Sequence, residues 1–145
     1  MKDINRVHGN YIKIDNLLSL KESTAVASTS KDKWANLRSA NDQAYFVLIF
    51  AQFEDLVNTR FKKLVKKKQA VPLWYRRRSW DIIDMKRIPF MIRVALLTEI
   101  GNADYNMIYS YYKLRCTIAH GDIAGGIIVS ILKNHLIEIA RRLKI

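Results

Sequence analysis

The stretch Tyr45–Leu64, with the sequence YFVLIFAQFEDLVNTRFKKL, decides the fold of this 145-residue chain. Its apolar side chains recur at helical spacing, and this pattern extends one residue further, to Val65. The stripe consists of Phe50, Phe53, Val57, Phe61, Leu64 and Val65. This spacing predicts an α-helix with one buried face. At the start of the stretch, Ala44–Ala51 is apolar on every side, so we expect that part of the helix to be buried all round.

One carboxylate falls on this apolar stripe. At about 100° per residue, Glu54 lies between Phe61 and Val65, whereas Asp55 points away. An unpaired charge on a buried face costs several kcal/mol, so Glu54 needs a partner. Arg115 is the candidate partner. The alternative is that Glu54 lies at the edge of the stripe and reaches water.

A second informative stretch is Tyr111–Gly121, YYKLRCTIAHG, which places Arg115 and His120 five positions apart. A guanidinium is a fixed positive fork that fits a phosphate, and an imidazole titrates near neutral pH. The two groups together suit phosphodiester chemistry without a metal. On a straight helix they would lie about 140° apart. Either the helix ends near Gly121 and His120 bends back, or a second copy of the chain completes the site. The purely structural alternative is a helix C-terminus, with Gly121 as the stop.

The Arg115-x4-His120 motif resembles that of the HEPN superfamily. The resemblance includes Ile118–Gly121, Tyr45–Leu64 and Arg78–Asp81, and extends over roughly residues 40–142. It implies an all-α, HEPN-like bundle of four to six helices that dimerises through the motif face. It also implies a metal-independent endoribonuclease, in which the RNA 2′-hydroxyl attacks the adjacent phosphate. The products would be a 2′,3′-cyclic phosphate and a 5′-hydroxyl.

The resemblance also implies a role for each site residue. His120 would move protons to or from the attacking and leaving oxygens, Arg115 would stabilise charge on the phosphorane, and Glu54 would orient Arg115. Tyr112 and Cys116 are expected to support the motif. The implied biological setting is a toxin of a toxin–antitoxin or phage-defence module, with RNA, a second copy of the chain and a cognate antitoxin protein as partners.

Many family members carry Asn or another polar residue at the position of Cys116. The alternative function is therefore a non-catalytic HEPN-like module for RNA or nucleotide binding or for dimerisation. A DNA-binding helical regulator is a third class, but the chain has no helix-turn-helix pattern.

The charge of the chain predicts a polyanionic partner. Lys and Arg number 25 and Asp and Glu 13, for a net charge of +12. Basic residues cluster twice, at 66–68 and at 76–78. The second cluster lies among aromatic residues, whose rings can stack bases while the cations hold phosphates. The candidate RNA-binding residues are Lys66, Lys67, Lys68, Arg76, Arg77 and Arg78. The alternative is that Trp74 and Trp80 anchor the core and the arginines form a solvated corner; we expect at least Trp80 to belong to the core.

Composition excludes several other classes. Half of the residues are apolar, with only 5 Gly and 2 Pro, which favours one helical globular domain. The chain lacks a phosphate-binding glycine loop and zinc-type Cys and His spacing, so we expect no cofactor and no metal. The single cysteine excludes an internal disulfide and fits a reducing cytoplasm. No apolar run reaches the roughly eighteen residues of a membrane span, so we expect no membrane partner.

We expect residues 1–33 to form an N-terminal segment, partly helical or loop, and residues 34–145 to form the helical domain. Lys21–Lys33 reads as a loop, and His8 as a solvated turn residue. Ser30 is a candidate cap for a helix that starts near Asp32. Whether this helix breaks around residues 39–42 or continues is left open by the pattern.

Further along the chain, Val71-Pro72 is expected to stop the long helix. Ser79 is the expected cap of a helix from Trp80, which Pro89 would kink or divide before Gly101. Asn102 or Asp104 would open the motif helix. A last helix from about Ile127 is expected to bury five apolar residues and to hold His135 at its boundary. The five are Ile128, Leu132, Leu136, Ile139 and Leu143.

Overall fold

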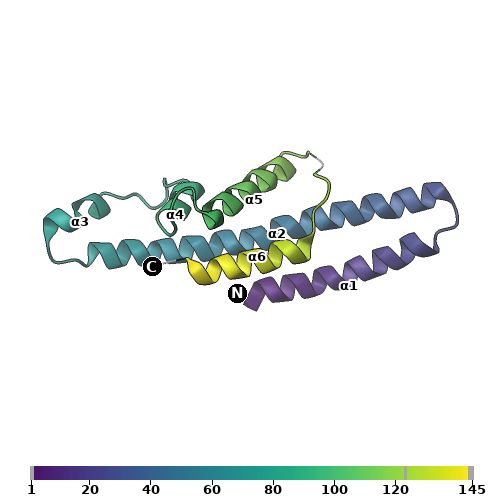
Figure 1. Cartoon of the computed structure of the whole chain (residues 1–145), viewed down its shortest axis with the longest axis horizontal. Helices are drawn as coiled ribbons and strands as arrows, with labels where there is room; N and C mark the ends of the chain where they lie inside the picture. Colours follow the sequence, from purple (N-terminus) through teal and green to yellow (C-terminus); the bar gives the residue numbers. More distant parts are fainter. Residues whose placement is uncertain (1, 123, 144–145) are drawn as a thin grey trace.

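The computed structural model describes residues 2–122 and 124–143, and this part of the chain is all-helical with no strand. The helices are α1 (Lys2–Thr24), α2 (Ser28–Gln69), α3 (Trp74–Asp81), α4 (Phe90–Ala95), α5 (Ala103–Ala119) and α6 (Val129–Arg142). The long helix α2 runs through the whole molecule, and the other helices pack along it (Figure 1). The predicted all-α class is confirmed.

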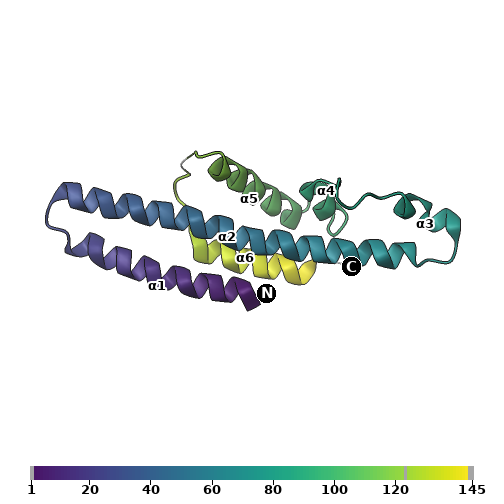
Figure 2. The ribbon, with the colours of Figure 1, turned by 180° about the vertical axis from the view of Figure 1, so that it is seen from behind.

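Helix α2 is the axis of the core. It continues through residues 39–42 without a break and ends at Gln69, shortly before Pro72, as expected. The predicted stripe is confirmed, since all six of its members are buried, together with Phe46 and Ile49. Helices α5 and α6 pack against α2 in the same part of the molecule, so the centre of α2 contributes most of the core (Figures 1 and 2).

The expected loop over Lys21–Lys33 is wrong. Helix α1 continues to Thr24 and α2 begins at Ser28, with Ala27 rather than Ser30 at its N-cap. The two helices form an antiparallel hairpin (Figure 2). Ion pairs hold these two helices together: the Arg38 guanidinium donates to Asp15 at 2.6 Å and to Glu22 at 3.4 Å.

The N-terminal helix also reaches α6. His8 is a partly buried helical residue whose Nε2 lies 2.9 Å from the hydroxyl of Ser130, so its placement in a solvated turn is wrong. Ile4 and Tyr11 are buried, and the Tyr11 hydroxyl donates to Asp42 at 2.9 Å. Helix α1 is therefore part of the same core as the rest of the chain.

The segment around Pro89 differs from the expected helix. Helix α3 already begins at Trp74 and ends at Asp81, so Ser79 lies inside it and caps nothing. Residues 82–89 are non-helical, and α4 starts directly after Pro89 because proline fits a helix start but not its interior. Arg93 holds the irregular segment by donating to the carbonyls of Ile88 and Met85. The expected apolar face ends at Leu97, since Ile100 is exposed.

The last two helices begin close to their predicted positions. Asn102 caps α5 by accepting a hydrogen bond from the Tyr105 amide at 2.8 Å. Helix α6 begins at Val129 and buries three of the five expected residues, and a fourth, Leu143, is buried directly after its end. The exception is Ile128, which precedes the helix and is exposed. None of the described helices is both long and apolar enough to cross a membrane.

One face of α2 is left uncovered. Ala44, Leu48 and Ala51 are exposed, and the Leu48 side chain is 50% accessible, so the predicted burial on every side is wrong for this chain by itself. These three residues recur at spacings of four and three, which places them on one side of the helix. We call this surface the α2 strip.

Candidate active site

The predicted partner of Glu54 is present. Arg115 extends from α5 towards α2, where its Nη2 lies 3.8 Å from Oε2 of Glu54. The Glu54 side chain is mostly buried, with 20% of its surface exposed. Burial raises the pKa of Glu54 and the Arg115 charge opposes that rise. At 3.8 Å the two groups form an ion pair, but the distance exceeds hydrogen-bonding length.

Tyr112 and Cys116 lie beside this ion pair. They are four residues apart on α5 and therefore neighbours on its surface. Burial is the main cause that raises the pKa of Tyr112. The neighbouring Cys116, with a side-chain hydrogen bond to it, raises this pKa further, and so does Glu54. The Tyr112 ring stacks on Phe90 of α4, with ring centres 5.3 Å apart. Four of the predicted site residues thus share one location between α2, α4 and α5.

His120 occupies the exposed end of α5. It is the C-cap residue, and Gly121 follows with φ 92°, a left-handed conformation that glycine adopts without strain. The amide of Gly121 donates to Ile118 at 3.0 Å and that of Asp122 to Thr117 at 3.2 Å. These two bonds define a Schellman motif. The structural alternative, a glycine-terminated helix end, therefore describes the backbone of this segment correctly.

Arg115 and His120 do not meet within one chain. Over residues 2–122 and 124–143, no hydrogen bond or ion pair joins their side chains. Arg115 faces α2, whereas His120 lies at the exposed end of the helix, about 7.5 Å further along its axis at 1.5 Å per residue. Of the two arrangements that would unite them, the helix does end near Gly121, but the imidazole does not bend back into contact with the guanidinium.

The candidate RNA-binding residues lie elsewhere. The three lysines are in the last turn of α2 and the three arginines are in α3. Lys66 is twelve residues beyond Glu54, about 18 Å along the helix axis. The basic clusters are therefore close to each other but not to the motif. Trp80 is partly buried against the core, as expected, while Trp74 is exposed.

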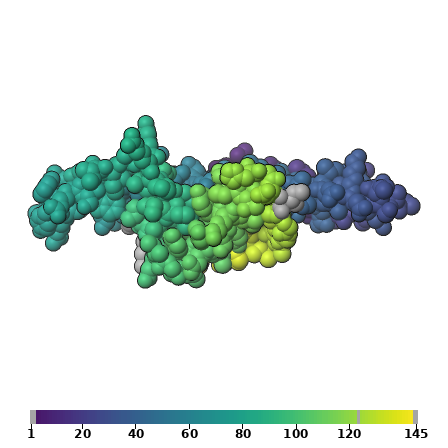
Figure 3. Space-filling model, turned by 90° about the horizontal axis from the view of Figure 1, so that it is seen from above, coloured from purple at the N-terminus to yellow at the C-terminus, as the bar shows by residue number. Residues whose placement is uncertain are grey.

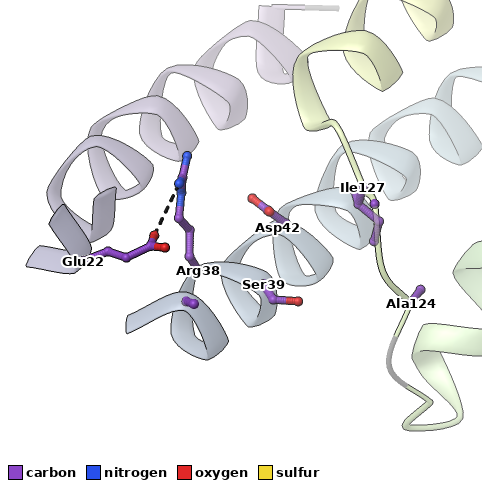
Figure 4. A pocket seen from close by; sticks show the side chains of 8 residues that line it. Glu22, Arg38, Ser39, Asp42, Ala124 and Ile127 are labelled. Carbon is purple, nitrogen blue, oxygen red and sulfur yellow. Dashed lines mark hydrogen bonds and ion pairs between the residues drawn. The ribbon is translucent and has the colours of Figure 1, made fainter. Parts of the chain in front are cut away.

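Sequence reasoning missed a polar pocket between the α1–α2 hairpin and the segment before α6. Glu22, Arg38, Ser39 and Asp42 line it, with the chain at 124–127 on the other side (Figure 4). Its volume is about 270 Å³. The spacing of Arg38 and Asp42 by four residues was a signal that both side chains share one face of α2. Burial raises the pKa of Asp42.

The described residues contain no group of three or more His, Cys, Asp or Glu side chains that could hold a metal ion. Compared with family profiles, curated proteins and solved structures, the chain gives no significant match.

Proposed function

We propose that this protein is a HEPN-type, metal-independent endoribonuclease. The observation that carries the proposal is the Glu54–Arg115 ion pair. In the motif this arginine would hold the scissile phosphate. A carboxylate beside it orients the guanidinium and leaves other N–H donors to bind the phosphate. The net charge of +12 supports an RNA substrate.

The proposed reaction is general acid–base catalysis by two imidazoles. One His120 removes the proton from the RNA 2′-hydroxyl, whose oxygen then attacks the phosphorus. The bond to the 5′-oxygen breaks, and a second His120 protonates that oxygen. Arg115 stabilises the negative charge that develops on the phosphorane oxygens. Acid–base assistance of this kind contributes roughly 10²–10⁴-fold.

The two imidazoles come from two copies of the chain. In the described part of one chain His120 is exposed and forms no hydrogen bond or ion pair with Arg115, so we take a single copy to hold an incomplete site. The α2 strip supports pairing of two copies, because Leu48 and its neighbours are apolar and uncovered. Ala51 precedes Glu54 by three residues, which brings this apolar surface next to the ion pair. Dimerisation there would exclude water from the site.

The proposed biological role is that of a toxin in a toxin–antitoxin or phage-defence module, in which a cognate antitoxin protein restrains the nuclease. This role rests on the resemblance of the Arg115-x4-His120 motif and not on a feature of the surface.

The test is cleavage of RNA by the purified protein in the presence of EDTA. The wild type should release fragments with 2′,3′-cyclic phosphate and 5′-hydroxyl ends, while His120→Ala and Arg115→Ala should each lose about 10²–10⁴-fold in rate. Arg87→Ala is the matched control, because the Arg87 side chain is 89% exposed and lies outside the motif. Full activity in folded His120→Ala protein would remove the proposal.

A second candidate is a non-catalytic RNA-binding module. The observation that favours it is Cys116, which contacts Tyr112 beside the ion pair instead of offering a stronger polar group to a substrate. This candidate predicts salt-sensitive RNA binding without any cleavage product.

A further inference from the structure

The end of the molecule formed by the last turn of α2 and by α3 exposes aromatic and basic side chains together. Trp74 is 61% exposed and Tyr75 59% exposed, which is unusual for large aromatic residues without a partner. Helix α3 and the end of α2 form one end of the molecule, opposite the turn between α1 and α2 (Figures 1 and 3). Neither aromatic side chain is needed to cover the core.

Each exposed ring is paired with an arginine. The Arg78 guanidinium lies 5.7 Å from the centre of the Trp74 ring, and that of Arg76 lies 5.8 Å from the centre of the Tyr75 ring. A cation on one face of an aromatic ring leaves the other face free for stacking. Lys66 and Lys68 add exposed charge at the adjoining end of α2. We call Trp74, Tyr75, Arg76 and Arg78 the aromatic platform.

Two neighbours of the platform serve a different purpose. The Arg77 guanidinium donates to Asp81 at 3.2 Å and to the carbonyl of Pro72 at 3.2 Å, so it holds the α2–α3 turn together. Trp80 packs against the core, and its backbone carbonyl accepts a hydrogen bond from the side-chain amide of Gln69 at 2.9 Å. These internal contacts fix α3 to α2 and leave the platform side chains outward. Arg77 therefore stabilises the turn, and we do not count it as part of the platform.

We propose that the aromatic platform binds single-stranded RNA, with bases stacked on Trp74 and Tyr75 and phosphates held by the surrounding cations. The inference deepens the proposed nuclease function and rests on it for the identity of the ligand as RNA. Duplex bases are stacked on one another and offer no free face, so exposed rings select unpaired nucleotides. The positive charge matches a polyanionic strand.

The platform is separate from the chemistry. Lys68 follows Glu54 by fourteen residues of one continuous helix, about 21 Å along its axis. A strand bound at the platform therefore crosses the ion pair several nucleotides away. The enzyme requires an unpaired stretch on one side of the cut, which restricts its substrates to loops, tails and single strands.

The experiment uses a fluorescent oligonucleotide of mixed sequence with 2′-O-methyl groups throughout. It lacks the attacking hydroxyl, so binding is measured by anisotropy whether or not the protein is a nuclease. The single strand should bind more tightly than the same strand in a duplex. Trp74→Ala and Tyr75→Ala should each weaken single-strand binding by about tenfold. Combined Arg76→Ala and Arg78→Ala should lower the salt slope by roughly 0.7 for each phosphate that the protein no longer neutralises.

Trp34→Ala is the matched control, because Trp34 lies near the opposite end of α2 and is also paired with a cation, Lys33, at 6.0 Å. This variant should bind like the wild type. Equal affinity for duplex and single strand, or unchanged binding in folded Trp74→Ala and Tyr75→Ala, would overturn the platform. The platform would also be overturned if these variants lose binding to anionic phospholipid vesicles but keep binding to RNA. A failure of this kind leaves the His120→Ala cleavage test unaffected, so the two proposals fail separately.

Discussion

Nη2 of Arg115 lies 3.8 Å from Oε2 of Glu54, which joins helices α5 and α2 at the motif. This ion pair predicts the behaviour of Glu54→Gln, which keeps the side-chain volume but removes the charge. We expect kcat for RNA cleavage to fall by about tenfold with little change in KM, because Arg115 loses its positioning partner but keeps its own charge. Steady-state cleavage assays measure both constants. Glu54→Asp should recover part of kcat; an unchanged kcat in Glu54→Gln would show that the pair does not position Arg115.

The opposite faces of α2 predict contrasting effects on stability. Phe53 is fully buried, so Phe53→Ala should lower the free energy of unfolding by about 3–5 kcal/mol, because it removes buried apolar surface and leaves a cavity. Leu48→Ala, on the α2 strip, should change the stability of the monomer by less than about 0.5 kcal/mol. Urea denaturation of dilute protein measures both. A large effect of Leu48→Ala at low concentration would mean that the strip is covered within one chain.

The same strip predicts an effect on assembly. Leu48→Lys places a charge on the apolar surface that we propose to pair, so the variant should remain folded and helical but become monomeric. Light scattering measures the mass, and circular dichroism checks the fold. Leu20→Lys, at an exposed leucine of α1, adds the same charge away from the strip and is the control. A Leu48→Lys protein that still dimerises would exclude this face as the interface.

The contact between His8 and Ser130 predicts a pH dependence of stability. Burial, with the nearby positive charge of Lys133 as a second cause, lowers the pKa of His8 below its ordinary value of 6.5. The unfolded chain therefore takes up the proton first as the pH falls. This residue does not reduce stability above about pH 6.5, and its cost grows as the pH drops below that value. Urea midpoints between pH 7.5 and 5.5 should fall less in His8→Gln than in the wild type. An equal fall in both proteins would show that protonation of His8 does not cause the pH dependence.

The ion pairs of Arg38 predict that this residue stabilises the hairpin of α1 and α2. It is the cation between Asp15 and Glu22 of α1, and Arg38→Met removes its charge while keeping most of its stem. Because the Arg38 side chain is 39% exposed, the expected loss in the free energy of unfolding is only about 1 kcal/mol. Hydrogen exchange of the α1 amides should rise selectively. Arg6→Met, at an arginine that is 76% exposed, is the control and should change neither measurement.

Local patterns predicted the parts of the structure that depend on helical geometry. The apolar stripe of α2 and the place of Glu54 on that stripe follow from spacing along one helix. The end of α5 at His120-Gly121 follows from the need of that turn for a left-handed residue. These features are decided by residues close in sequence, or by one pairing of opposite charges on helical faces.

Contacts between distant residues could not be predicted. His8 and Ser130 are 122 positions apart, and no local signal connects them. Lys21–Lys33 has the composition of a loop, yet its polar side chains form the outer surface of a hairpin stabilised by Arg38. Leu48 shows the opposite error, since it is apolar but half exposed. The sequence of an apolar helix face does not show whether another part of the same chain covers it.

The uninterrupted length of α2 also affects how the molecule behaves in solution. Its 42 residues extend about 63 Å. A compact chain of this size has a radius of gyration of about 15 Å, which corresponds to a sphere roughly 40 Å across. The protein is therefore a rod whose friction exceeds that of a sphere of equal mass, and it emerges early from a sizing column. An apparent doubling of mass by elution volume would thus reflect shape as much as pairing.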